Sequence, residues 1–250
     1  MIKLIESPDE LPHGFSGPLF ARIAGTAAAY GYSMPFALFW RQINDVTGED
    51  TAVVSSFDCN MTLCAFDNAD FDELAEFLPA VGGQTLLCES RVVHQLGFDS
   101  GSEYTALEFI TESEISVGAE SDDFTLEELY ALLKSGEDGE IELPEHDAWY
   151  ADMSHRIRHG GAEVFAVREG NTLAAAAVSP FVSEGLALIS GVAVDPLCRR
   201  KGLGKNAVAG LAVRLKLSDR QVFVISEEKL IPFYKSAGFC VCGSVAKIIL

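Results

Sequence analysis

Residues 185–206 combine side chains and turns that could bind a polyanion. The segment reads GLALISGVAVDPLCRRKGLGKN, an apolar stretch followed by a proline, basic residues and the turn Gly202-Leu203-Gly204. The two glycines have no Cβ, so main-chain N–H groups can approach an anion closely. A helix is expected to follow, and its N-terminus adds partial positive charge. The pattern predicts a phosphate-binding loop.

The charge around this turn is opposite to that of the chain, whose formal net charge is −19. Residues 1–120 hold 19 acidic and 4 basic residues, whereas residues 199–250 hold 3 acidic and 10 basic ones. The basic residues nearest the turn are Arg199, Arg200, Lys201 and Lys205. An acidic protein repels nucleic acids and anionic membranes. We therefore expect a compact phosphorylated cofactor here, and neither nucleic acid nor membrane as a partner.

Two common phosphate-binding motifs fit this loop incompletely. A Walker loop needs glycine at 199 and Ser or Thr at 206, where the chain has Arg199 and Asn206. A dinucleotide fingerprint, G-x-G-x-x-G/A, is matched by Gly202, Gly204 and Ala207. That fingerprint turns directly from strand to helix, whereas seven residues separate the predicted strand from Gly202 here. A dinucleotide-binding protein stays open as the weaker alternative.

A third motif fits the spacing better. Arg199, Gly202 and Gly204 match R/Q-x-x-G-x-G/A, and they follow the strand-like VAVDP at 192–196. This pattern resembles the GNAT superfamily of acetyl-coenzyme-A-dependent N-acetyltransferases. Residues 233–239, FYKSAGF, look like that family's Y-x-x-x-G-F segment. Two elements in the expected order support the resemblance.

The resemblance covers roughly residues 122–250 and implies acetyl-CoA as co-substrate, an amine as acceptor and no metal. The main-chain groups that it implies for pantetheine binding are those of Val192, Ala193 and Val194. It also implies that the loop 199–204 wraps the pyrophosphate and that Tyr234 is the acid for the departing thiol. A phenol with a pKa near ~10 can protonate or hydrogen-bond that sulfur. Glu227 departs from the family pattern, which commonly has Asn there.

The general base and the acceptor are not specified by the sequence. A lysine-like amine is only about one part in a thousand neutral near pH 7.4, so a group must accept its proton. The residues considered are Glu163, Glu184, Asp152 and His155, with Tyr150 as a pocket residue. Ordinary surface or capping roles account for each, so we assign none. A non-catalytic module that binds coenzyme A stays open as a rival function.

Hydrophobic periodicity places these motifs in the second half of the chain. Helices are expected at 124–134, after the capping residues Asp122 and Asp123, and at 149–159. Strands are expected at 162–168, 173–179 and 185–194, then a helix at 202–216, a strand at 222–225, a short helix ending at Ala237, and strand structure over 239–250. The polar segments 111–123 and 135–147 predict a seam and a loop.

The first half shows a shorter version of the same order. The expected strands are 36–43, 51–56, 61–66, 85–88 and 104–110, with helices at 71–81 and 91–96. We expect a mixed α/β fold of tandem GNAT-like units, each a twisted sheet flanked by helices, with domains at 1–115 and 122–250.

The first unit lacks the residues for a second site. Asp67 and Asp70 lie where the phosphate-binding loop should be, and Val93 occupies the place of Tyr234. We expect this unit to cover the acceptor cleft or to form an interface, including that of a homodimer. Its net charge of −15 favours a cationic small-molecule or peptide amine.

Composition agrees with a folded protein, with 48% hydrophobic and 22% charged residues. No apolar run approaches the roughly 18 residues of a membrane helix, and the first ten residues lack a signal-peptide pattern. The six cysteines are expected to be reduced, in a cytoplasmic protein. His155 and His159 have helical spacing, but no third metal ligand is evident.

Overall fold

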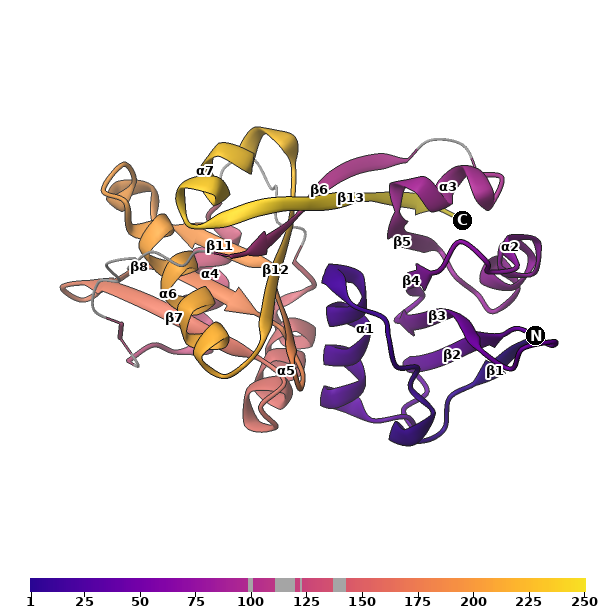
Figure 1. The fold of residues 1–250 in the computed structure, drawn as a ribbon. Helices are drawn as coiled ribbons and strands as arrows, with labels where there is room; N and C mark the ends of the chain where they lie inside the picture. Colours follow the sequence, from indigo (N-terminus) through magenta and orange to yellow (C-terminus); the bar gives the residue numbers. More distant parts are fainter. Residues whose placement is uncertain (99–100, 111–119, 122, 137–142) are drawn as a thin grey trace.

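The computed structural model describes residues 1–98, 101–110, 120–121, 123–136 and 143–250. The fold is mixed α/β, and each half of the chain supplies one unit of strands and helices (Figure 1). The elements of the first unit are β1 Ile2–Leu4, the 3-10 helix Pro8–Glu10, α1 Gly17–Tyr30, β2 Ala37–Ile43, β3 Asp50–Phe57, β4 Asn60–Ala65, α2 Phe71–Ala80, β5 Thr85–Glu89, α3 Ser90–Gln95 and β6 Ser102–Phe109.

The second unit repeats much of this order. Its elements are α4 Leu126–Lys134, α5 His146–Arg158, β7 Glu163–Glu169, β8 Thr172–Ser179, β9 Phe181–Val182, β10 Leu186–Ile189, β11 Gly191–Val194, the 3-10 helix Pro196–Cys198, α6 Leu203–Leu217, β12 Gln221–Ser226, the 3-10 helix Glu228–Leu230, α7 Ile231–Ser236 and β13 Phe239–Ile249. The strands and helices predicted from the sequence are found within a few residues of their expected bounds. The predicted seam and loop fall largely outside the described residues.

Three local expectations are corrected. The strand predicted at 185–194 is divided at Ser190 into β10 and β11. Helix α1 and strand β1 were not expected. Helix α4 is capped by Thr125 rather than by Asp123, because Thr125 Oγ1 accepts a hydrogen bond from the Glu128 N–H while the Glu128 carboxylate accepts one from the Thr125 N–H. Asp122 lies outside the described residues.

The two units exchange their last strands within one ten-stranded sheet, whose order is β1-β2-β3-β4-β5-β13-β6-β12-β10-β9. Strand β13, from the second unit, pairs with β5 of the first, from Val245 opposite Glu89 to Ile249 opposite Thr85. Strand β6, from the first unit, pairs with β12 of the second. Both termini therefore lie at the same end of the molecule (Figure 1).

This exchange joins the units through main-chain hydrogen bonds. The expected division into 1–115 and 122–250 follows the order of elements along the chain, whereas the sheet is continuous across it. A shift in register between Val241 and Gly243 lets β13 follow β6 over most of its length.

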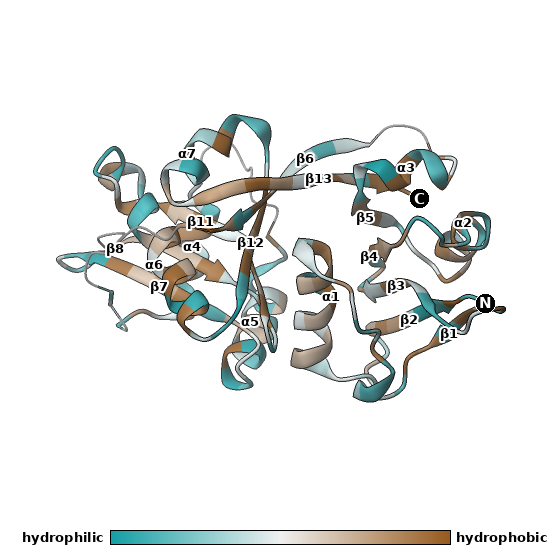
Figure 2. Ribbon diagram, viewed as in Figure 1, coloured by the Kyte–Doolittle hydropathy of each residue, from teal (hydrophilic) through white to brown (hydrophobic). Residues whose placement is uncertain are grey.

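Helix α1 lies between the two units (Figure 1). One side packs on strands of the first unit, in a core that includes Phe39, Val53 and Cys64. The other side reaches the second unit, where a Cβ on Gly25 would meet the main chain of Phe181 at 2.7 Å. Only glycine therefore permits this close approach. Figure 2 shows little hydrophilic surface on α1, in agreement with burial from both sides.

The core of the second unit surrounds α6. Its buried face contains Ala207, Leu211 and Leu215, and a Cβ on Gly210 would meet the ring of Phe165 at 2.5 Å. Small residues thus bring α6 close to the three-stranded sheet β11-β8-β7. None of the helices described has both the length and the apolar character that crossing a membrane requires.

Candidate active site

The break at Ser190 divides one extended segment into β10 and β11, and these two strands belong to different sheets. Up to Ile189 the chain is β10, which pairs in parallel with β12. Beyond Ser190 it continues as β11, which pairs with β8 in the other sheet. No described strand pairs with the second edge of β11. A cleft of about 860 Å³ lies between β11 and β12, and we call it the β11–β12 cleft.

The main chain of β11 directs polar groups into this cleft. The Asp195 N–H donates to the Ala174 carbonyl of β8 at 2.9 Å. Successive residues of an antiparallel strand direct their hydrogen-bonding groups to opposite edges, so Ala193 faces β8 while Val192 and Val194 face away from it. The Val194 carbonyl accepts a hydrogen bond from Arg199 Nε at 3.4 Å, as this orientation requires.

The loop after β11 ends at the N-terminus of α6. Gly202 is the N-cap and has φ 79°, a left-handed conformation that favours glycine, and Arg200 has φ 66°. Gly204 is buried, and a Cβ there would meet Val194 Cγ2 at 2.9 Å. The glycines are therefore explained by backbone conformation and close packing, and the helix N-terminus is held near the cleft.

The ten residues predicted to bind a cofactor divide into two groups. Six of them line the cleft: Val192, Ala193, Val194, Arg199, Arg200 and Gly204. The other four, Lys201, Gly202, Leu203 and Lys205, are not among the lining residues. Lys201 instead forms an ion pair with Glu169 at the end of β7. Lys205 is exposed on the first turn of α6.

Tyr234 lines the same cleft from α7. Its side chain is buried and makes edge-to-face contacts with the rings of Phe233 and Phe239, at centroid distances of 5.0 and 5.8 Å. Burial raises the pKa of its phenol to about 12, because the charged phenolate is poorly solvated there. The phenol is therefore protonated at neutral pH, as an acid must be.

Several lining residues were not predicted. Ser190, Ser226 and Lys229 could have been found only by knowing how the strands separate. Tyr104 comes from β6 of the first unit and reaches the cleft because of the strand exchange. Glu227, the departure from the family pattern, also lines the cleft and pairs with Lys229 at 3.2 Å.

Comparisons with known proteins agree with this geometry. Residues 131–247 match the model of an acetyltransferase (GNAT) domain. The match covers most of the second unit. No curated protein matches the sequence.

Solved structures extend the likeness to the whole chain. A GNAT-family acetyltransferase from Colwellia psychrerythraea has a TM-score of 0.58 at 14% identity, covering 100% of this chain and 99% of that one. A tandem GNAT protein from the clavulanic acid biosynthesis pathway has a TM-score of 0.56 at 13% identity, covering 99% and 97%. A GCN5-related N-acetyltransferase from Sphaerobacter thermophilus has a TM-score of 0.59 at 12% identity, covering 92% and 90%. These identities show the fold, which is that of tandem GNAT units, and acyl transfer is the reaction class that the family supports.

In the first unit, the side chain of Arg91 connects the ends of two strands that separate. Strands β4 and β5 pair only from Asn60–Thr62 to Thr85–Leu87 and then separate. Arg91 spans the gap, donating to the Ala65 carbonyl at 2.7 Å and to the Glu89 carboxylate at 2.5 Å. It also pairs with Asp67. Asp67 thus has a structural role beyond the expected repulsion of phosphate.

Asp70 is also structural, since its carboxylate caps α2 by accepting the Glu73 N–H. Val93 is buried in the core of the first unit. The expectation that the first unit holds no second site stays a prediction.

A second cavity, of about 400 Å³, lies beside the β11–β12 cleft and shares Ser190 with it. We call it the α1–α5 cavity, because α1 of the first unit and α5 of the second form two of its walls. Among the base candidates and Tyr150, only Asp152 lines it. His155 stacks on Tyr30, and its Nε2 lies 2.8 Å from the Ala29 carbonyl oxygen.

The other candidates lie away from both cavities. Glu163 pairs with Arg214 and Arg220. Glu184 is exposed in the turn before β10, and Tyr150 packs beside His146. Asp152 itself accepts hydrogen bonds from Arg156 Nε and from the Tyr30 hydroxyl. Both contacts engage the Asp152 carboxylate within the protein, and none of these residues is assigned the proton.

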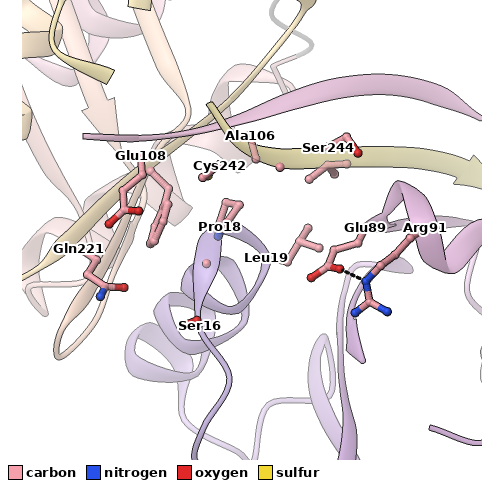
Figure 3. Close-up of a pocket in the computed structure, with 14 residues that line it drawn as sticks. Ser16, Pro18, Leu19, Glu89, Arg91, Ala106, Glu108, Gln221, Cys242 and Ser244 are labelled. Atoms are coloured by element: carbon pink, nitrogen blue, oxygen red, sulfur yellow. Dashed lines mark hydrogen bonds and ion pairs between the residues drawn. The ribbon is translucent and has the colours of Figure 1, made fainter. Parts of the chain in front are cut away.

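A third cavity, of about 560 Å³, lies where the exchanged strands cross the start of α1 (Figure 3). Glu108 and Glu89 line it, and Glu89 is joined to Arg91 in this view. It contains none of the predicted site residues. Within the described part of the chain, no group of three or more His, Cys, Asp or Glu side chains is placed to hold a metal ion.

Proposed function

We propose that the protein is an acetyl-CoA-dependent N-acetyltransferase that transfers the acetyl group to an amine by direct attack. The observation that supports this most is the separation of β11 from β12, which leaves an unpaired strand edge leading to the N-terminus of α6. A strand edge offers main-chain donors and acceptors to an extended amide chain. A helix N-terminus beside arginines favours phosphate.

The residues present fit the donor. Val192 and Val194 would pair their outward main-chain groups with the pantetheine amides, while Ala193 faces β8 and supports the strand. Arg199 and Arg200 line the cleft where the pyrophosphate would lie. The Gly202-Leu203-Gly204 turn and Lys205 would contribute main-chain N–H groups and charge from the start of α6. We retain Lys201 only as an outer contact, because Glu169 engages its ammonium group.

Bound acetyl-CoA would supply a thioester carbonyl that a neutral amine attacks. The Val192 N–H points away from β8 and would hold the carbonyl oxygen as negative charge develops on it. Tyr234 would donate its phenolic hydrogen bond to the sulfur as the thiol departs. Ser190, which lines both cavities, marks where the acceptor amine meets the donor.

The rival function is a coenzyme-A-binding module without turnover. Binding alone does not separate the two, whereas thiol release from acetyl-CoA in the presence of an amine panel does. The dinucleotide alternative requires a doubly wound parallel sheet, and here β11 is antiparallel to β8. The cytoplasmic location, the homodimer, and the exclusion of nucleic acid and membrane stay predictions.

Calorimetry of coenzyme A tests the cleft assignment. The double substitution Arg199→Ala and Arg200→Ala should raise the dissociation constant at least about tenfold, since a hydrogen bond to a charged group contributes roughly 1.5–3 kcal/mol. A matched control is Arg158→Ala with Lys216→Ala, which removes two exposed cations outside the cleft. Equal affinity in the first variant and the wild type would refute the assignment.

A further inference from the structure

The α1–α5 cavity adjoins the β11–β12 cleft through shared lining residues. Arg22 and Ser190 line both this cavity and a smaller one of about 170 Å³. The smaller cavity shares Tyr104, Ser190 and Ile225 with the β11–β12 cleft. An acceptor lying in the α1–α5 cavity could therefore reach a thioester at Ser190.

Four charged side chains line the α1–α5 cavity, namely Arg22, Asp58, Asp152 and Arg156. Arg156 is 1% exposed, and its charge is matched by Asp152, whose carboxylate lies 2.7 Å from Arg156 Nε. Its guanidinium also donates to the Pro180 carbonyl at 2.9 Å. Asp58 lies on the exposed turn between β3 and β4. Of the two arginines that line the cavity, Arg22 is the one whose charge has not yet been matched to a carboxylate.

Arg22 has no carboxylate partner among the residues that the structure describes. It is partly buried on α1, and its guanidinium carbon lies 4.7 Å from the ring centre of Phe181. Arg156 contacts the same ring at 5.2 Å, so a second cation is close. Burial, and to a smaller extent Arg156, lowers the pKa of Arg22 to about 10. The side chain is still charged at neutral pH.

An unmatched, partly buried guanidinium is unfavourable unless an anion compensates it. Its planar fork binds carboxylate and phosphate groups through two parallel hydrogen bonds. Hydroxyl groups are nearby, because Ser55 and Thr62 line the same cavity and are buried. The cavity therefore has the chemistry of an anion subsite, and it shares Ser190 with the β11–β12 cleft.

We propose that the acceptor is a small amine that also bears a carboxylate or phosphate group, and that Arg22 binds this group in the α1–α5 cavity. The amine part of this inference rests on the proposed acetyl transfer, whereas the anion-binding part does not. It refines the cationic acceptor expected from the charge of the first unit. The ammonium end is attracted by the acidic surface, and the anionic end is held by Arg22.

Acetyl transfer is measured with paired amines that differ only in the anion. The pairs are γ-aminobutyrate with butylamine, phosphoethanolamine with ethanolamine, and glucosamine 6-phosphate with glucosamine. The wild type should prefer anionic members at least about tenfold in kcat/KM. Arg22→Gln should lower that ratio at least about tenfold, and Arg22→Lys should restore part of it. Arg158→Gln, an exposed arginine of α5, is the matched control. Preference for the carboxylate or the phosphate pair identifies the source of the anion.

A second readout does not depend on turnover. Trp149 lines the cavity, so its fluorescence reports on ligands there, and Trp149→Phe identifies its part of the signal. Succinate or inorganic phosphate should change this fluorescence saturably in the wild type, with an apparent Kd at least about tenfold higher in Arg22→Gln. A protein that binds these anions but not coenzyme A would refute the proposed function and leave the subsite standing.

Three results overturn the proposal. One is a wild type that prefers the amines without a carboxylate or phosphate group. Another is an Arg22→Gln variant that slows both members of each pair equally. The third is a wild type in which neither succinate nor phosphate gives a saturable fluorescence signal. If no amine of the panel is acetylated, this third result alone overturns the proposal.

Discussion

Replacing Tyr234 with phenylalanine tests how the departing thiol is stabilised. The ring should stay in place, since its contacts with Phe233 and Phe239 involve the aromatic face and edge rather than the hydroxyl. The substitution thus removes one donor from the β11–β12 cleft with little change in packing. Its effect on the rate should report on the hydroxyl alone.

The size of the effect follows from the pKa of the phenol, which burial raises to about 12. A thiol with a pKa near ~8.5 lies about 3.5 pKa units lower, so complete proton transfer to the thiolate would be uphill by about 4.8 kcal/mol. Tyr234 is therefore expected to donate a hydrogen bond to the developing charge rather than to lose its proton. A hydrogen bond of that kind contributes roughly 1.5–3 kcal/mol, which corresponds to a kcat lower by about 10- to 150-fold.

The assay is thiol release from acetyl-CoA at saturating amine, followed over pH in the wild type and in Tyr234→Phe. Because the phenol stays protonated well past its ordinary range, the wild-type rate should rise with amine deprotonation and show no fall near pH 10. Tyr104→Phe is the informative comparison, since Tyr104 brings a second phenol to the same cleft. A large loss in Tyr104→Phe together with an unchanged Tyr234→Phe would refute the assignment of Tyr234. A fall near pH 10 that Tyr234→Phe abolishes would instead contradict the raised pKa of the phenol.

Two further predictions concern stability. Arg156→Met should lower the free energy of unfolding by about 3 kcal/mol in urea titrations, because it leaves Asp152 and the Pro180 carbonyl without their buried partner; a loss below about 1 kcal/mol would contradict this reasoning. The raised pKa of Tyr234 stabilises the folded state fully below pH 10, and this contribution is lost as pH rises from 10 towards 12. Between pH 8 and 11 the wild type should lose about 1.4 kcal/mol more than Tyr234→Phe does, and parallel pH curves for the two proteins would show that the phenol is not protected.

The parts of the site that lie close together in the sequence were predictable. Strand, loop and helix N-terminus follow one another within 185–206, and their chemistry depends on local backbone conformation. Gly202 needs a positive φ and Gly204 needs space beside Val194, both of which are properties of a few neighbouring residues. Tyr234 was predicted from its family pattern, and the structure places it in the cleft.

Helix α1 was not predictable from periodicity, because it is apolar on more than one side. Periodicity identifies a helix when one face is exposed and the other is buried. Here the first unit covers one face of α1, and Phe181 lies against Gly25 on the other. The helix therefore shows no clear polar stripe. Its position also explains why Arg22 was not recognised, since the cavity that Arg22 lines exists only once the two units are joined.

The strand exchange was hidden for a different reason. The sequences of strands β6 and β13 do not specify which neighbour each strand pairs with. The choice depends on contacts between residues far apart in the chain, such as Val224 opposite Leu107. Periodicity could therefore identify two repeated units but could not show that each ends in the other's part of the sheet.

This exchange gives the first unit a role in the site although Arg91 connects the ends of its own strands β4 and β5. Strand β6 brings Tyr104 to the β11–β12 cleft, and α1 brings Arg22 to the α1–α5 cavity. Residues from both halves thus meet around Ser190, the point where β10 and β11 divide. The first unit, which has no phosphate-binding loop of this kind, thus supplies lining residues to both cavities. In the proposed function, the second unit would hold the donor and both units would enclose the acceptor.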